Sequence, residues 1–155
     1  TYEVDDYKDP TTGDTVMKIV DNLSHLYNLT EIRVLDLSKN EMLSDISSLA
    51  DTSGGLRNIE MLYLDKELGV KCQNENGEDI LYEYHPFTDL SSLRWMPKLI
   101  ALSMQNSGLN DINFVGSLGA IEYLNLSGHS LDTIDFSLFR GKEEIKYLSR
   151  VIHNE

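Results

Sequence analysis

The sequence predicts an α/β protein: a right-handed solenoid with short parallel β-strands on its concave face, irregular or 3-10 helical return segments, and an inserted β-hairpin. Three observations support this prediction. Pairs of aliphatic residues separated by one position recur along the chain, each pair follows a further aliphatic residue by three positions, and a short acidic-aliphatic segment recurs in the same register. The length of 155 residues suits one domain.

The aliphatic pairs define four coils. They are Leu35 with Leu37, Leu62 with Leu64, Leu102 with Met104, and Leu124 with Leu126. On a strand the two members of a pair point to the same side, into the core, and the residue between them points outward. One such unit cannot bury its own apolar side, so successive units must stack.

The acidic-aliphatic segments give the period. They resemble D-I-x-x-L and begin at Asn22, Asp45, Asp89 and Asp111, and a weaker copy begins at Thr133. The steps between these positions are 23, 44, 22 and 22 residues. The sequence therefore predicts a 22-residue repeat with one doubled step.

In this pattern the chain resembles the leucine-rich repeat family, and within it the internalin-like bacterial class with 22-residue repeats. The motif runs through Leu29, Ile32, Leu35, Leu37 and Asn40, and it recurs through Leu118, Ile121, Leu124 and Leu126. The resemblance implies a bacterial protein that is secreted or held at the cell surface and binds other proteins, with a cytoplasmic location as the alternative.

The chain departs from this family at one position of the repeat. The asparagine that usually ends the strand is present only as Asn40, and the equivalent positions hold Glu67, Ser107 and His129. We therefore expect the buried column of asparagine hydrogen bonds to be incomplete.

The doubled step contains an insertion at residues 68–85. Apolar residues alternate on both sides of Asn76 and Gly77, and alternation around Asn-Gly is a strong signal for a β-hairpin. We favour this hairpin over a second interpretation, in which residues 80–82 form an irregular extra strand and His85 takes the asparagine position.

The two ends of the chain are less regular than its middle. Residues 1–19 predict an N-terminal cap, either a hairpin or a damaged repeat, because the end of a solenoid core needs a cover. The repeats are expected over residues 20–139. Residues 140–155 predict either a capping helix or a truncated repeat, since Arg150 stands where an inward leucine belongs.

Composition and motifs disfavour several functions. The chain has 13 basic and 26 acidic residues and a net charge of -13, so it lacks the basic footprint of a nucleic-acid binder. No apolar run is long enough for membrane insertion. The lone cysteine, Cys72, and the four histidines show no metal-ligand or catalytic spacing. We expect no enzyme activity, no catalytic residues, no cofactor and no metal.

The outward positions of the predicted strands form three columns on the concave face. Tyrosine and methionine stand there beside short polar residues, a mixture enriched at protein interfaces. We expect this face to bind a protein or peptide, and the negative charge favours a partner with a basic face. The expected partner-binding residues are Val34, Asp36, Ser38, Met61, Tyr63, Asp65, Ser103, Gln105, Tyr123, Asn125 and Ser127.

A second function from a different class remains open at this point. The chain begins without an initiator methionine, so we also consider a piece excised from a longer surface protein. In that case the repeats would serve as a structural spacer, and the active domain would lie outside this chain.

Overall fold

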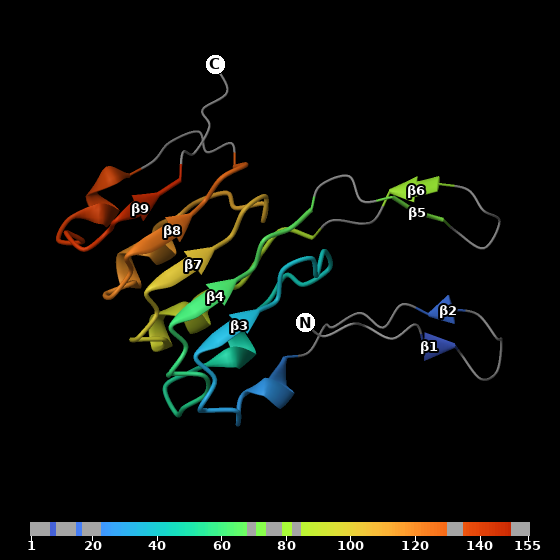
Figure 1. The fold of residues 1–155 in the computed structure, drawn as a ribbon, viewed down its shortest axis with the longest axis horizontal. Coiled ribbons are helices and arrows are strands. Elements are labelled where there is room, and N and C mark those ends of the chain that lie inside the picture. The colour runs from blue at the N-terminus through green and yellow to red at the C-terminus, as the bar shows by residue number, and fades with distance from the viewer. Residues whose placement is uncertain are drawn as a thin grey trace, which may run out of the picture.

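The main feature of the fold is one parallel β-sheet built from five short strands (Figure 1). The computed structural model describes residues 7–8, 15–16, 23–67, 71–73, 79–81, 85–129 and 135–149. In sheet order the strands are β3 (Val34–Asp36), β4 (Met61–Tyr63), β7 (Ala101–Ser103), β8 (Tyr123–Asn125) and β9 (Tyr147–Leu148). All four neighbouring pairs run parallel, which confirms the predicted right-handed solenoid.

The register of the sheet stacks the predicted leucines into one ladder. Leu35 pairs with Leu62, Leu62 with Leu102, and Leu102 with Leu124. All four side chains are buried. The ladder continues to Leu148 opposite Leu124, but Leu148 is 44% exposed, because within the described residues no further strand pairs with β9.

The return segments are 3-10 turns, which lie behind the sheet in Figure 1. They are η1 (Ser24–Leu26), η2 (Ser47–Leu49), η3 (Ser91–Trp95), η4 (Asn113–Ser117) and η5 (Phe136–Phe139). The described residues contain no α-helix, so the α/β label holds here only in the sense of a sheet backed by a helical layer.

The recurring aspartates explain why a turn forms at η2, η3, η4 and η5. The Oδ1 atoms of Asp45, Asp89, Asp111 and Asp135 each accept a hydrogen bond from the backbone N–H two residues later, at 2.7–2.9 Å. Such side-chain bonds favour turns over strands. Hydrogen bonds from the side chain and the backbone of Ser91 lower the pKa of Asp89, and the same groups of Ser137 lower the pKa of Asp135.

A polar column follows the C-terminal ends of the strands. Asn40 Nδ2, Ser107 Oγ and His129 Nδ1 each lie 2.6–2.9 Å from the carbonyl oxygen three residues earlier in the chain. The column holds only one asparagine, as expected, yet serine and histidine make the equivalent bond in the third and fourth coils. At the second coil Glu67 is exposed and the neighbouring Lys66 is buried instead.

Two small antiparallel pairs accompany the main sheet. Strand β5 (Lys71–Gln73) pairs with β6 (Asp79–Leu81) inside the insertion, as the hairpin interpretation predicts. The alternative of an extra solenoid strand there is wrong, because β4 pairs directly with β7. Near the N-terminus β1 (Tyr7–Lys8) pairs with β2 (Thr15–Val16), which is the pairing of the hairpin alternative for the N-terminal cap.

At the C-terminal end the described residues form a strand rather than a helix. Strand β9 continues the sheet beyond residue 139 by pairing with β8. The choice between a cap and a truncated repeat stays a prediction. Arg150, on which that prediction depended, lies outside the described residues.

Candidate functional site

The first column of the concave face is apolar along its whole length. The sheet register places Val34, Met61, Ala101 and Tyr123 on neighbouring strands, and Tyr147 of β9 extends the column by one strand. Val34, Tyr123 and Tyr147 are 56%, 46% and 52% exposed, respectively, whereas Met61 and Ala101 are half-buried. We call these five residues the apolar stripe.

Tyr147 is the residue of this stripe that sequence reasoning missed. A signal for it was present, because Ile145 and Leu148 have the spacing of the repeat and Ile145 packs against the core. The polar Arg150 at the next inward position concealed it. The structure therefore adds an exposed tyrosine to the predicted set.

The second column is formed by Asp36, Tyr63, Ser103 and Asn125. It is less exposed than the sequence suggested. Ser103 is only 8% exposed, and its Oγ donates a hydrogen bond to Asp65 Oδ1 at 2.6 Å and accepts one from Asn125 Nδ2 at 3.0 Å. Asp65 Oδ1 also accepts from the backbone N–H of Gln105 at 2.7 Å. These groups fix one another, and Ser103 is the predicted contact residue with the least surface to offer a partner.

The third column is formed by Ser38, Asp65, Gln105 and Ser127. Its two serines order residues of the second column by hydrogen bonds at the ends of β3 and β8. Asp36 Oδ1 accepts from the backbone N–H of Ser38 at 2.9 Å, and this bond lowers the pKa of Asp36. Asn125 Oδ1 accepts from Ser127 Oγ at 2.8 Å and from the Ser127 N–H at 3.2 Å. Tyr63 adds a contact between its hydroxyl and Met61 Sδ at 3.7 Å. The polar half of the face is therefore pre-ordered in the free protein.

Ion pairs border the apolar stripe at the N-terminal ends of the strands. Arg33 Nη1 lies 3.1 Å from Glu60 Oε1, and Lys146 Nζ lies 2.6 Å from Glu122 Oε2. Each residue immediately precedes a stripe residue, so each pair joins two neighbouring strands. Exposed pairs of this kind add little stability, but they cancel charge beside the stripe.

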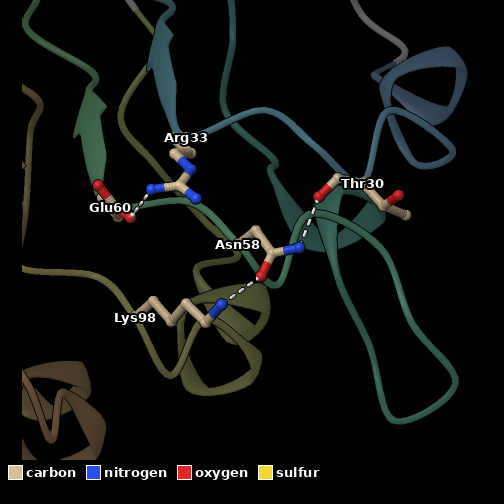
Figure 2. Close-up of polar contacts among 5 residues, drawn as sticks. All are labelled: Thr30, Arg33, Asn58, Glu60 and Lys98. Atoms are coloured by element: carbon tan, nitrogen blue, oxygen red, sulfur yellow. Dashed lines mark hydrogen bonds and ion pairs between the residues drawn. The ribbon is translucent and has the colours of Figure 1, made fainter.

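Further out, amide and ammonium groups link three coils (Figure 2). Asn58 Nδ2 donates to the carbonyl oxygen of Thr30 at 2.9 Å, and Lys98 Nζ donates to Asn58 Oδ1 at 2.7 Å. The same view shows the Arg33–Glu60 pair above them. This border of the sheet is therefore held by polar bonds between successive coils.

A hollow lies away from the apolar stripe, where residues 86–94 and 109–117 meet. It has a volume of about 740 Å³, and its lining combines apolar side chains such as Phe87 and Phe114 with polar ones such as Asn110 and Asp111. Arg94 is its basic lining residue. The repeat pattern carries no signal for this hollow, because its walls come from the irregular segments between strands.

The described residues contain no cluster of metal-ligating side chains. No group of three His, Cys, Asp or Glu side chains among them could hold a metal ion. His129 serves the polar column described above, and burial lowers its pKa. Within the same ranges, no helix is long and apolar enough to cross a membrane.

Comparisons with known proteins agree with the fold. No family model matches the chain, and no curated protein matches it. Among solved structures, an internalin C2 from Listeria monocytogenes is similar, with a TM-score of 0.60 and 22% identity over 83% of this chain and 46% of the other. An internalin F of the same organism has a TM-score of 0.36 and 20% identity, over 81% of this chain and 49% of the other.

The likeness to internalin C2 bears on architecture. At 22% identity, the similarity to internalin C2 supports the leucine-rich repeat solenoid and nothing finer. The chain spans about half the length of each of these two structures.

Proposed function

We propose that this chain is a non-enzymatic recognition module that binds a protein or peptide through its concave face. The observation that carries the proposal is the apolar stripe: five apolar side chains in register on five parallel strands, three of them exposed. Exposed aromatic residues that are held rigidly lose little conformational freedom on binding. Tyrosine is also among the residues that dominate binding energies at interfaces.

The partner that fits this face has an apolar ridge beside basic groups. The ridge would cover the stripe, and the basic groups would meet Asp36, whose lowered pKa keeps it charged at neutral pH. The net charge of -13 would further attract a basic partner and make association sensitive to salt. We further propose that the chain belongs to the internalin-like class with 22-residue repeats. We also propose that it is secreted or held at the cell surface, with a cytoplasmic location as the alternative.

A structural spacer within a longer surface protein is the second candidate. Leu148, at 44% exposure, favours it, because the equivalent leucines of the other coils are buried by a neighbouring coil. A further coil stacked on β9 would bury Leu148 in the same way.

The test begins with capture of partners by the purified chain at low and high salt, followed by affinity measurements with the purified partner. Tyr123→Ala combined with Tyr147→Ala should weaken binding at least about tenfold, the loss typical of an interface hot spot. Tyr27→Ala is the matched control, because Tyr27 follows the return segment η1 and does not belong to the stripe. Its hydroxyl donates to Asp51. A double variant that folds and binds unchanged would contradict the proposal and direct attention to the hollow near Phe114 or to the spacer.

A further inference from the structure

The buried ammonium group of Lys66 lies inside a cage of hydrogen-bond acceptors. Its Nζ donates to the carbonyl oxygens of Glu41 at 2.8 Å and Leu43 at 2.6 Å, and also to the carbonyl oxygen of His85. The ring of Phe87 covers it, with its centroid 4.6 Å from Nζ. Lys66 is only 4% exposed, although lysine is rarely buried unless it is paired.

The chemistry of this cage suits a cation. An ammonium group has three N–H donors, and three backbone carbonyls receive them. A π face attracts a positive charge, and the Glu41 carboxylate attracts it as well. Burial lowers the pKa of Lys66 to about 8, and Glu41 offsets part of this effect. Burying a charge is costly without such partners.

The cage lies where the insertion leaves and rejoins the solenoid. Lys66 precedes the inserted segment, and His85 follows the pair of strands β5 and β6. Both ends of the insertion are bonded to Glu41 of the first coil: the N–H of Glu67 donates to its Oε1 at 3.0 Å, and the N–H of His85 donates to its carbonyl oxygen at 3.0 Å. Lys66 Nζ joins the same two ends directly.

We propose that the carbonyls of Glu41, Leu43 and His85 form a cation site that Lys66 fills from within, and that this tethered ammonium fixes the ends of the insertion to the first coil. Lys66 is then a positioning residue for the inserted hairpin. The ligand class of the vacated site is a primary alkylammonium ion. The inference is independent of the concave face, which lies on other residues.

The test compares Lys66→Met with Lys142→Met by hydrogen exchange. Lys142 is the matched control, because its Nζ also donates to a backbone carbonyl, that of Leu118 at 2.7 Å, but in a distant coil. In Lys66→Met the amides of His85 and Thr88, which bond Glu41 and Ser44, should exchange about tenfold faster or more, while β7 and β8 change less. Equal acceleration of all segments, or none, would overturn the positioning role.

Chemical rescue tests the cation site itself and applies even if the variant is unfolded. Lys66→Ala removes Cγ, Cδ, Cε and Nζ of the side chain, and n-propylammonium has the same heavy atoms. Millimolar n-propylammonium should restore protection at His85, or folding where that is lost, beyond the effect of sodium chloride at equal ionic strength. Tetramethylammonium has the charge but no N–H donor, so it should not rescue. Failure of n-propylammonium, or equal rescue by tetramethylammonium, would overturn the proposal.

Discussion

His129 and Ser107 connect the third and fourth coils inside the protein: the backbone N–H of Ser107 lies 3.1 Å from Nε2 of the buried His129 ring. The other ring nitrogen, Nδ1, lies 2.9 Å from the carbonyl oxygen of Leu126. A carbonyl can only accept and an amide can only donate, so the proton resides on Nδ1 and Nε2 is the acceptor. The structure thus requires a neutral imidazole.

This relationship predicts acid sensitivity. Burial lowers the pKa of His129 below its ordinary value of 6.5, so the unfolded chain binds this proton more readily than the folded one. Stability is therefore full above pH 6.5 and falls as the pH decreases from 6.5 toward the folded pKa, by about 1.4 kcal/mol for each unit of pKa difference. Urea denaturation at pH 7.5, 6.0 and 5.0 measures the effect.

The control for that experiment is His129→Asn. Asparagine stands at the equivalent position of the first coil as Asn40, where its Nδ2 donates to the carbonyl oxygen three residues earlier. At position 129 it can donate to Leu126 in the same way without titrating. We expect the variant to lose the His129 share of the pH dependence between pH 7.5 and 5.0. If both proteins lose the same stability over this range, the histidine is not the responsible group.

Gly128 predicts a steric requirement at the end of β8. Its φ is +79°, and a Cβ built there would lie 1.8 Å from Asn106 Oδ1 of the preceding coil. Gly128→Ala should lower the free energy of unfolding by about 1–3 kcal/mol, the cost of backbone strain plus the displaced contact. Gly119→Ala is the control, because its Cβ would meet no atom within 4 Å. Equal thermal unfolding midpoints for the two variants would contradict this account.

The repeated coils of the fold could be predicted because the leucine pattern that produces them repeats along the sequence. A leucine at every second position of a short strand must point to one side, and Leu35, Leu62, Leu102 and Leu124 do so in register. The inserted hairpin was predictable from local chemistry, since Asn76-Gly77 favours a tight turn between alternating residues. Both signals lie within short stretches of sequence.

What escaped prediction depends on contacts between coils. From the sequence alone, Lys66 would be expected at the surface. Its burial is explained only by the carbonyl oxygens of residues 41, 43 and 85, which converge on its Nζ. Ser103 reads as an outward contact residue, yet Asp65 and Asn125 of the neighbouring strands enclose it. The sequence thus predicted which residues share the sheet register, whereas their exposure required the three-dimensional structure. That these residues bind a partner stays a prediction.

The interior and the C-terminal end of the leucine ladder should respond differently to truncation. Leu124 is fully buried between two coils, so Leu124→Ala should cost about 2–5 kcal/mol of unfolding free energy through lost burial and a cavity. Leu148 occupies the same repeat position but is 44% exposed, and Leu148→Ala should cost less than about 1 kcal/mol. Chemical denaturation measures both. A large cost at Leu148 would indicate that this leucine is covered in solution, for example by a second copy of the chain.

The proposed interface predicts that charge and apolar contact act on different rate constants. Asp36 carries an exposed carboxylate whose pKa is lowered by its bond to Ser38, so it stays ionised at neutral pH and can steer a basic partner. Asp36→Asn keeps the shape and the acceptor oxygen but removes the charge. It should slow association at low salt and flatten the salt dependence, with little change in dissociation.

Tyr123→Ala supplies the contrasting case in the same measurement. It removes exposed apolar surface and no charge, so dissociation should accelerate about tenfold or more at every salt concentration while the salt dependence of association stays intact. Surface plasmon resonance with the captured partner, at about 50 and 300 mM salt, resolves both constants across the range in which the Debye length shortens. If Asp36→Asn leaves the salt slope unchanged, the partner meets other acidic groups; if Tyr123→Ala leaves dissociation unchanged, the stripe is not the contact surface.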